Sequence, residues 1–177
     1  LDLKLHDIPN TVEKSIYPLV TKVKPYMLTL HIAGGKKMLQ ESVAAATKVS
    51  IEYNITKPLL LGVTVLTSLN NKDFEEMGHS ILIEDYVKNY SKIAINANLE
   101  GIVCSPLEVE LIKKLYGDNL KLVTPGIRLK RNPNDEQSRF LTPKEAFKNG
   151  ATSIVMGRSI TKGDIKKNIQ KLVKSLN

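Results

Sequence analysis

Short apolar runs alternate along this chain with longer amphipathic stretches, and this alternation limits the folds open to it. Runs such as LLLGVTVLTS are apolar at nearly every position, which is typical of strands buried on both faces of a parallel sheet. Parallel strands need crossover connections, which are right-handed and usually helical. We therefore predict a parallel α/β fold. The predicted strands span residues 1–5, 26–32, 59–68, 100–105, 120–124 and 152–157.

Helix start and stop signals lie between these runs. Thr142 and Pro143 have the residue types of an N-cap and a first helical position, and Gly150 has that of a C-cap. A Ser-Pro pair at 105–106 and Gly117 delimit another helix in the same way. A turn is expected at 8–11. The predicted helices span residues 34–53, 80–97, 105–117, 142–150 and the tail from Asp164.

Six strand-then-helix units fit either an open doubly wound sheet or a (β/α)8 barrel. A barrel has eight strands and usually about 250 residues, whereas this chain has 177. Because the first unit begins directly on a strand, the pattern favours a TIM (β/α)8 barrel without its first two units. No linker, low-complexity stretch or repeat is visible, so residues 1–177 are predicted to form a single domain.

The formal net charge of +8 has two interpretations. One is an anionic partner, either nucleic acid or a phosphorylated small molecule; the other is a lysine-rich solvated surface. The lysines are mostly scattered singly along helical stretches, and the chain has no tryptophan, zinc-finger spacing or aromatic-basic RNA motif. We therefore expect no nucleic-acid partner.

Cysteine usage and hydropathy point to a compartment. The single cysteine, Cys104, excludes an internal disulfide and fits a reducing environment. No apolar run approaches the roughly 20 residues of a membrane span, and the charged first residues do not resemble a signal peptide. We expect a cytoplasmic protein without a membrane partner.

Charged residues mark the first predicted strand end. In a parallel α/β fold, sites form at the carboxyl ends of strands. Asp2 and Lys4 share one face of the strand because side chains alternate along it, and Asp7 follows the strand end. Such charges need partners if buried. They indicate either a functional cluster or an exposed edge strand with an ordinary ion pair.

The last two strand ends, TPGIR and GRSIT, each combine a glycine with an arginine. In many barrels the loops at this place hold a phosphate. Arg128 and Arg158 would donate bidentate hydrogen bonds, and Gly126 and Gly157 would let the backbone approach. The alternative is a pair of tight turns with solvated arginines.

Three further features are secondary. His31 lies at a strand end before a Gly-Gly pair, and no other histidine or cysteine has metal-ligand spacing with it, so no metal is predicted. Cys104 is expected to be a core thiol. Thr67 and Ser68 end the predicted strand 59–68, where their hydroxyls would contact a ligand or cap the next helix.

Several motifs together resemble the orotidine 5′-phosphate decarboxylase family. They are LDLKLHDIPNT, HIAGG, VTVLTS, GIVCSPLE, TPGIR with DEQSRFLTP downstream, and GATSIVMGRSIT. They occur in the family's order and extend over essentially the whole chain. The opening D-x-K-x-x-D-I-P-N-T is highly specific when it is joined to TPGIR and GRSIT.

The resemblance implies a homodimeric barrel that converts orotidine 5′-monophosphate to uridine 5′-monophosphate and carbon dioxide in de novo pyrimidine biosynthesis, without a cofactor. It implies that Lys4 donates a proton to a carbanion at carbon 6, that Asp2 lies beside the leaving carboxylate, and that Asp7 reaches the partner subunit's site. Gln137 is expected on a loop that closes over the substrate. The implied substrate contacts are Asp2, Leu3, Lys4, Leu5, His6, Asp7, Ile8, Pro9, Asn10, Thr11, Thr67, Arg128, Gln137, Gly157 and Arg158.

The sequence also departs from the family. The family has two further βα units before this motif, which supply a ribose-binding aspartate and a second lysine. About six of eight units are therefore expected here, with exposed strand edges, low stability and weak activity of this chain alone.

Other functions stay open at this level. A related sugar-phosphate decarboxylase or synthase would depend on magnesium. A non-catalytic nucleotide-binding fragment would bind nucleotide without releasing carbon dioxide. A nucleic-acid binder would show steep salt dependence.

Overall fold

The fold is described from a computed structural model, which describes residues 1–129 and 141–176. The chain divides into two compact units. Unit 1 comprises Leu1–Thr64 and Glu84–Ile102, and unit 2 comprises Val65–Ile83 and Val103–Asn177. A single domain over residues 1–177 stays a prediction.

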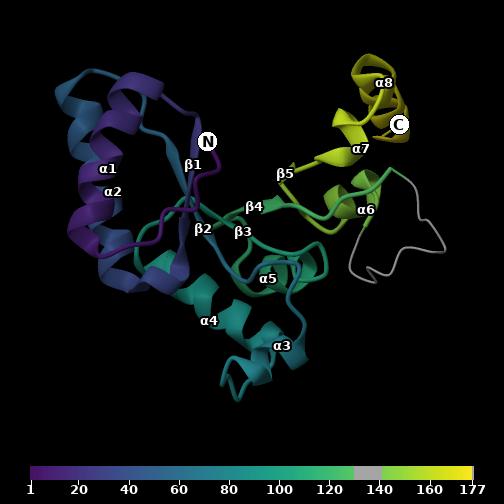
Figure 1. Ribbon diagram of the computed structural model, residues 1–177, viewed down its shortest axis with the longest axis horizontal. Coiled ribbons are helices and arrows are strands. Elements are labelled where there is room, and N and C mark those ends of the chain that lie inside the picture. Colours follow the sequence, from purple (N-terminus) through teal and green to yellow (C-terminus); the bar gives the residue numbers. More distant parts are fainter. Residues whose placement is uncertain (130–140, 177) are drawn as a thin grey trace. The chain divides into compact units, whose positions relative to one another are not determined.

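Unit 1 is built on two parallel strands, β1 (Met27–His31) and β2 (Leu59–Val63). Their register pairs Met27 with Leu59 and His31 with Val63. Two helices, α1 (Pro9–Pro18) and α2 (Gly35–Glu52), pack side by side next to these strands (Figure 1). The core between them contains the fully buried side chains of Ile16, Leu28, Leu30, Met38, Leu39 and Leu60.

Helix α1 replaces the turn that we expected at 8–11. Pro9 is its first residue, where the fixed φ of proline suits a helix and its missing N–H leaves no unpaired donor. Val12 and Ile16 are buried, four residues apart on one face. Tertiary burial of that face therefore extends a local turn signal into ten helical residues.

The first predicted strand, residues 1–5, is not a strand in the structure. Leu5 alone forms a bridge, parallel to Leu30 of β1. Lys4 has a left-handed backbone, with φ of 52°, which no regular strand contains. The segment nevertheless follows β1, because the Leu5 N–H donates to the Thr29 carbonyl oxygen at 3.0 Å and the His31 N–H donates to that of Leu5 at 2.9 Å.

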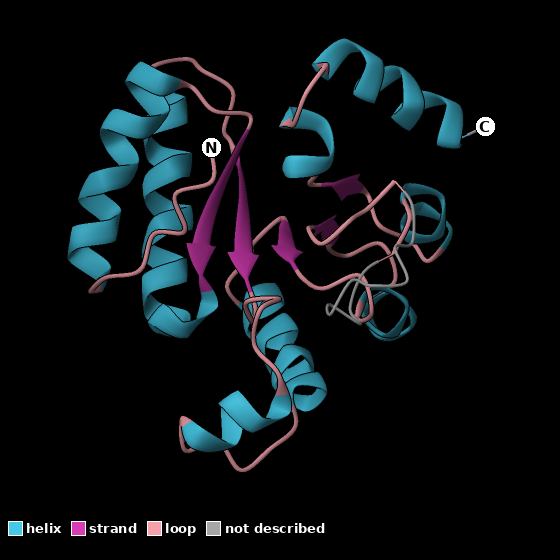
Figure 2. Cartoon of the chain, turned by 45° about the vertical axis from the view of Figure 1, so that its right-hand side comes forward, coloured by secondary structure: helices cyan, strands magenta, loops and turns pink. Residues whose placement is uncertain are grey.

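Unit 2 contains β4 (Lys121–Thr124) and β5 (Ser153–Ile154), which are also parallel. Figure 2 shows the short β5 among its helices. The Cys104 N–H, directly after β3 (Gly101–Val103), donates to the Val123 carbonyl oxygen at 3.2 Å. In unit 1, the Glu100 N–H directly before β3 donates to Leu60 of β2. Within each unit, strands that are neighbours in sequence are thus neighbours in space, as in a (β/α)8 barrel.

Helix caps in unit 2 follow the sequence signals in part. Thr142 forms the predicted N-cap within a capping box with Glu145. Gly117 ends its helix with φ of 59°. The start at Ser105 is wrong by four residues, because the Glu108 carboxylate accepts the Ser105 N–H at 2.8 Å and closes a turn before the helix.

The remaining predicted elements are present but shorter, and the short helices Asn71–Glu76 and Arg158–Thr161 were not predicted. Strand β2 ends at Val63 rather than at residue 68, and the long helix at 80–97 is α4 (Ile83–Asn96). No helix in the described ranges 1–129 and 141–176 has the length and apolarity to cross a membrane. The other helices are α3 (Asn71–Glu76), α5 (Val109–Tyr116), α6 (Pro143–Lys148), α7 (Arg158–Thr161) and α8 (Ile165–Leu176), with a π-helix at Leu19–Val23 and a 3-10 helix at Ile32–Gly34.

Gly62 is a point where strand β2 requires close packing. A Cβ atom there would lie 2.6 Å from Ile32 Cγ1 and 2.9 Å from Leu99 Cδ1, both core side chains of unit 1. We expect Gly62→Ala to lower the free energy of unfolding by about 1–3 kcal/mol, the usual cost of overpacking. Urea unfolding measures this change in the free energy of unfolding. The control is Ala44→Ser on the exposed side of α2, whose free energy of unfolding should stay within about 0.5 kcal/mol of the unaltered protein. Equal stability of the two variants would contradict the packing.

Candidate functional site

Asp2 and Lys4 form an ion pair beside the centre of β1. Lys4 Nζ lies 2.7 Å from Asp2 Oδ2, and the two side chains are 37% and 61% exposed. The two side chains meet, although their segment is not the strand on which we expected them to share a face. An ion pair this exposed contributes little to folding stability. A gain in stability therefore does not explain why the pair is held in one arrangement.

Thr29, in the centre of β1, holds both members of the pair. Its hydroxyl donates to Asp2 Oδ1 at 2.9 Å and accepts the Lys4 backbone N–H at 2.8 Å. Thr29 is only 6% exposed. Thr29 was not predicted as a site residue, because it lies inside an apolar run and its signal is only a hydroxyl among aliphatic neighbours.

The backbone of Lys4 is strained. A left-handed conformation at a residue with a Cβ atom costs about 1–2 kcal/mol, and Lys4 has φ of 52°. Such residues occur where surrounding contacts fix them, often at functional sites. The contact here is the hydroxyl of Thr29, which accepts the N–H that a regular strand would direct to its neighbour.

The pKa of Asp2 lies below the usual aspartate value. Partial burial acts to raise the pKa, but hydrogen bonds from Lys4 and Thr29, together with the charge of Lys4, outweigh it. Asp2 is therefore a carboxylate at neutral pH. The pair presents a fixed negative charge beside a fixed ammonium.

His6 and His31 lie next to the pair, with ring centroids 5.3 Å apart. Gly34 lies against Met38 of α2 and beside His6, since a Cβ atom there would lie 2.2 Å from Met38 Sδ and 3.4 Å from His6 Cδ2.

Asp7 lies apart from the pair. Its Oδ1 accepts the Ile8 N–H at 2.6 Å, and within residues 1–129 and 141–176 it makes no ion pair. Ile8, Asn10 and Thr11 are exposed at the start of α1, and Pro9 is half-buried. The segment 2–11 is therefore accessible along most of its length.

The other predicted contacts belong to unit 2. Thr67 is half-buried in the turn after β2, and Arg128 is half-buried beside Gly126, which has φ of 77°. Gly157 caps α7, where a Cβ atom would meet open space, and Arg158 is exposed. These four residues share unit 2, and the segment 2–11 belongs to unit 1. Gln137 lies outside the described residues.

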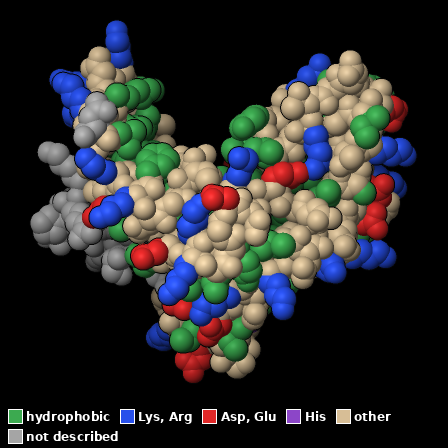
Figure 3. Space-filling view, turned by 180° about the vertical axis from the view of Figure 1, so that it is seen from behind, with side chains coloured by type: hydrophobic (Ala, Val, Ile, Leu, Met, Phe, Trp, Pro, Cys, Tyr) green, Lys and Arg blue, Asp and Glu red, His purple; other side chains and the backbone are tan. Residues whose placement is uncertain are grey.

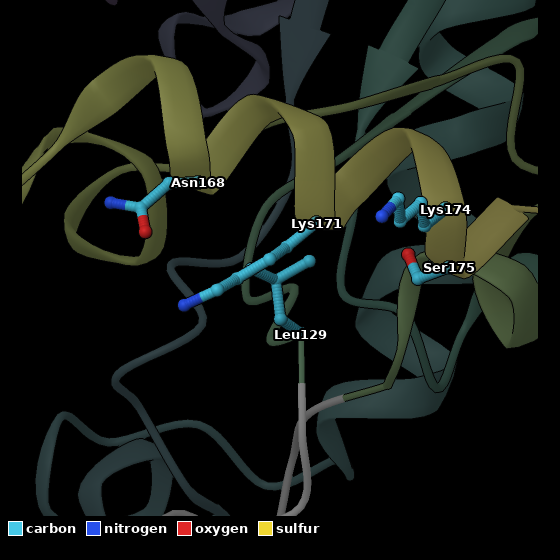
Figure 4. A pocket seen from close by; sticks show the side chains of 5 residues that line it. All are labelled: Leu129, Asn168, Lys171, Lys174 and Ser175. Carbon is cyan, nitrogen blue, oxygen red and sulfur yellow. The ribbon is translucent and has the colours of Figure 1, made fainter.

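Basic side chains do not form one continuous area on the face shown in Figure 3, where Lys and Arg are interspersed with Asp and Glu. Unit 2 has a cavity of about 550 Å³ between Leu129 and α8 (Figure 4). Lys171 extends past Leu129, and Asn168 donates to the carbonyl oxygens of Ile160 and Lys162. Among the described residues its walls include Leu129, Asn168, Lys171, Lys174 and Ser175, which contain no acid–base pair.

Metal and thiol chemistry find little support in the described parts of the chain. No group of three or more His, Cys, Asp and Glu side chains gathers there in a metal-binding arrangement. Cys104 is 1% exposed, as expected of a core thiol, and burial raises the pKa of its thiol. Among the described residues, we therefore take the Asp2–Lys4 pair as the candidate reactive group.

The family model of the orotidine 5′-phosphate decarboxylase / HUMPS family matches residues 1–171. A relative from Prochlorococcus marinus (strain MIT 9312), named orotidine 5′-phosphate decarboxylase, is 41% identical over 179 residues, covering all of this chain and 74% of the relative. A relative of the same name from Wolbachia sp. subsp. Brugia malayi (strain TRS) is 43% identical over 178 residues, which cover 100% of this chain and 75% of the relative. The chain thus spans about three quarters of their length.

Solved structures agree. The crystal structure of orotidine 5′-phosphate decarboxylase from Lactobacillus acidophilus matches all of this chain and 74% of its own, with a TM-score of 0.85 at 34% identity. The enzyme of the same name from Thermotoga maritima matches 98% of this chain and 72% of its own, with a TM-score of 0.67 at 24% identity, which supports the fold alone. The prediction of a partial (β/α)8 barrel of this type is confirmed.

His31 gives this part of the molecule a pH dependence. Burial, then the charges of His6 and Lys4, lower the pKa of His31 against an opposing effect of Asp2. Its contribution to stability is therefore present in full above the unfolded value of about 6.5 and is lost as pH falls through the lower folded pKa. We expect stability to fall less from pH 7 to about pH 5 in His31→Gln than in the unaltered protein. Urea unfolding at both pH values measures this, and identical losses would contradict the lowered pKa.

Proposed function

Because the chain belongs to the orotidine 5′-phosphate decarboxylase / HUMPS family, we propose that it decarboxylates orotidine 5′-monophosphate to uridine 5′-monophosphate, a step of pyrimidine biosynthesis. The observation that carries the proposal is the Asp2–Lys4 pair, with 2.7 Å between its charged atoms and both residues bonded to the buried Thr29 hydroxyl in the centre of β1. The family resemblance of residues 2–11 supports the same assignment.

The proposed chemistry centres on carbon 6 of the pyrimidine. The bond between carbon 6 and the carboxylate carbon breaks, carbon dioxide leaves, and the electron pair stays on carbon 6. Lys4 Nζ donates a proton to that carbon, and solvent returns a proton to Nζ. A fixed ammonium stabilises the developing negative charge in the transition state. Asp2 orients Nζ, and its own charge lies beside the leaving carboxylate.

The family resemblance assigns the phosphate of the substrate to the TPGIR and GRSIT motifs. The exposed guanidinium of Arg158 offers two parallel donors, and Gly157 leaves its backbone open to close approach. Arg128 and Thr67 add polar contacts, and Gln137 is assigned to the same ligand. Binding energy at the phosphate is used in the transition state when it orients the distant pyrimidine.

The proposal includes a cytoplasmic homodimer that needs no cofactor. Asp7 is assigned to the partner subunit's site. Its exposed carboxylate accepts a hydrogen bond only from its own neighbour, Ile8, among the described residues, which leaves it accessible to a second copy. The remaining substrate contacts are assigned to Leu3, Leu5, His6, Ile8, Pro9, Asn10 and Thr11.

Replacing Lys4 tests the proposed proton donor. We expect Lys4→Ala to reduce kcat for carbon dioxide release from orotidine 5′-monophosphate by at least about 10²–10⁴-fold, the usual contribution of a positioned acid. Lys14→Ala, at an exposed position of α1, is the matched control and should retain the rate. The rate is followed as loss of the orotate absorbance.

Three outcomes would overturn the assignment. Equal rates for Lys4→Ala and Lys14→Ala would remove Lys4 from the reaction. Nucleotide binding without carbon dioxide release by the unaltered protein would indicate a non-catalytic binding protein. Magnesium-dependent turnover of a sugar phosphate instead would indicate the related sugar-phosphate chemistry.

A further inference from the structure

The hydroxyl of Thr29 is the point from which both charged residues are held. It donates to Asp2 Oδ1 and accepts from the Lys4 N–H, at 2.9 and 2.8 Å. Asp2 Oδ2 is thereby left to receive Lys4 Nζ at 2.7 Å. The Thr29 backbone adds two more bonds, since its N–H donates to the Leu1 carbonyl oxygen and its carbonyl oxygen accepts the Leu5 N–H.

We infer that Thr29 is a positioning residue for the decarboxylation, which fixes the Asp2 carboxylate and the Lys4 backbone through a single buried hydroxyl. This inference rests on the proposed function, because it assigns Thr29 to the same reaction. Thr29 does not itself reach the substrate as a reacting group. It acts through Asp2 and Lys4.

A hydroxyl is suited to this task because it donates and accepts at one atom. Valine would fill the same volume and suits a buried strand better, yet it offers neither bond. Without the acceptor, the Lys4 N–H loses the contact that accompanies its left-handed φ of 52°. Two side chains, Lys4 and Thr29, lower the pKa of Asp2 by hydrogen bonding. Without the Thr29 hydroxyl, Lys4 alone remains of these two.

A purely structural role makes different predictions from a positioning role. If Thr29 only satisfied buried polar groups, Thr29→Val would lower the free energy of unfolding and leave kcat of the folded protein unchanged. If Thr29 positions the pair, kcat falls while KM changes little, because the contacts to the phosphate in unit 2 are untouched. Thr29→Ser keeps the hydroxyl and loses only a methyl group.

The experiment measures kcat and KM for orotidine 5′-monophosphate in Thr29→Val and Thr29→Ser. We expect kcat of Thr29→Val to fall by about 10–100-fold, the scale of a lost hydrogen bond to a charged group, with KM within about threefold. Thr29→Ser should restore kcat to within about threefold of the unaltered protein. Thr152→Val is the control, since its hydroxyl also donates to a strand, at the Leu122 carbonyl oxygen at 3.0 Å, and it should retain the rate. Unchanged kcat in Thr29→Val, or no rescue by serine, would overturn the inference.

A second measurement does not depend on turnover. The Asp2 carboxyl carbon is followed by NMR against pH in the full chain, where Lys4 and the amino-terminal ammonium also act on it. Thr29→Val should raise the pKa of Asp2, and Thr29→Ser should leave it in place. If the unaltered protein releases no carbon dioxide, the proposed function fails and this titration alone decides the positioning. An unchanged pKa of Asp2 in Thr29→Val would overturn the positioning role of Thr29.

Discussion

The hydrogen bonds at the Thr29 hydroxyl determine where the charged segment of this protein lies. Residues 1–5 do not form a regular strand, so their path depends on hydrogen bonds to β1. In the centre of β1 the side chain that forms these bonds is the hydroxyl of Thr29, among aliphatic neighbours. It turns the backbone at Lys4 into the left-handed region and leaves Asp2 facing the ammonium.

Stability does not account for this arrangement. The Asp2–Lys4 pair is largely exposed, where ion pairs contribute little, and the backbone of Lys4 adds a cost of about 1–2 kcal/mol. A strand with an aliphatic residue in place of Thr29 and a regular Lys4 would avoid this cost. The arrangement is explained by a use for a fixed ammonium beside a fixed carboxylate, and the decarboxylation that we propose supplies one.

The sequence predicted features that depend on local chemistry. The alternation of apolar runs and helices gave the fold class, Thr142 the capping box, and Asp2 and Lys4 the pair. It missed features that depend on partners distant in sequence. The helix at Pro9 is extended by burial of Val12 and Ile16, and the part played by Thr29 appears only when residues about 25 positions apart meet. The end of β2 at Val63 was also missed, because the apolar run continues through buried Thr64 and Val65, which lie beyond the last strand residue.

The central claim is that a nucleotide site is built around the Asp2–Lys4 pair. The most direct test is an NMR titration of backbone amides with uridine 5′-monophosphate and, separately, with uridine. If this claim holds, the amides of Leu3 to His6 shift together with a single Kd for the nucleotide. It also predicts that uridine binds much more weakly, because the phosphate contacts are lost. Shifts confined to other residues, or equal affinity for nucleotide and nucleoside, would contradict it.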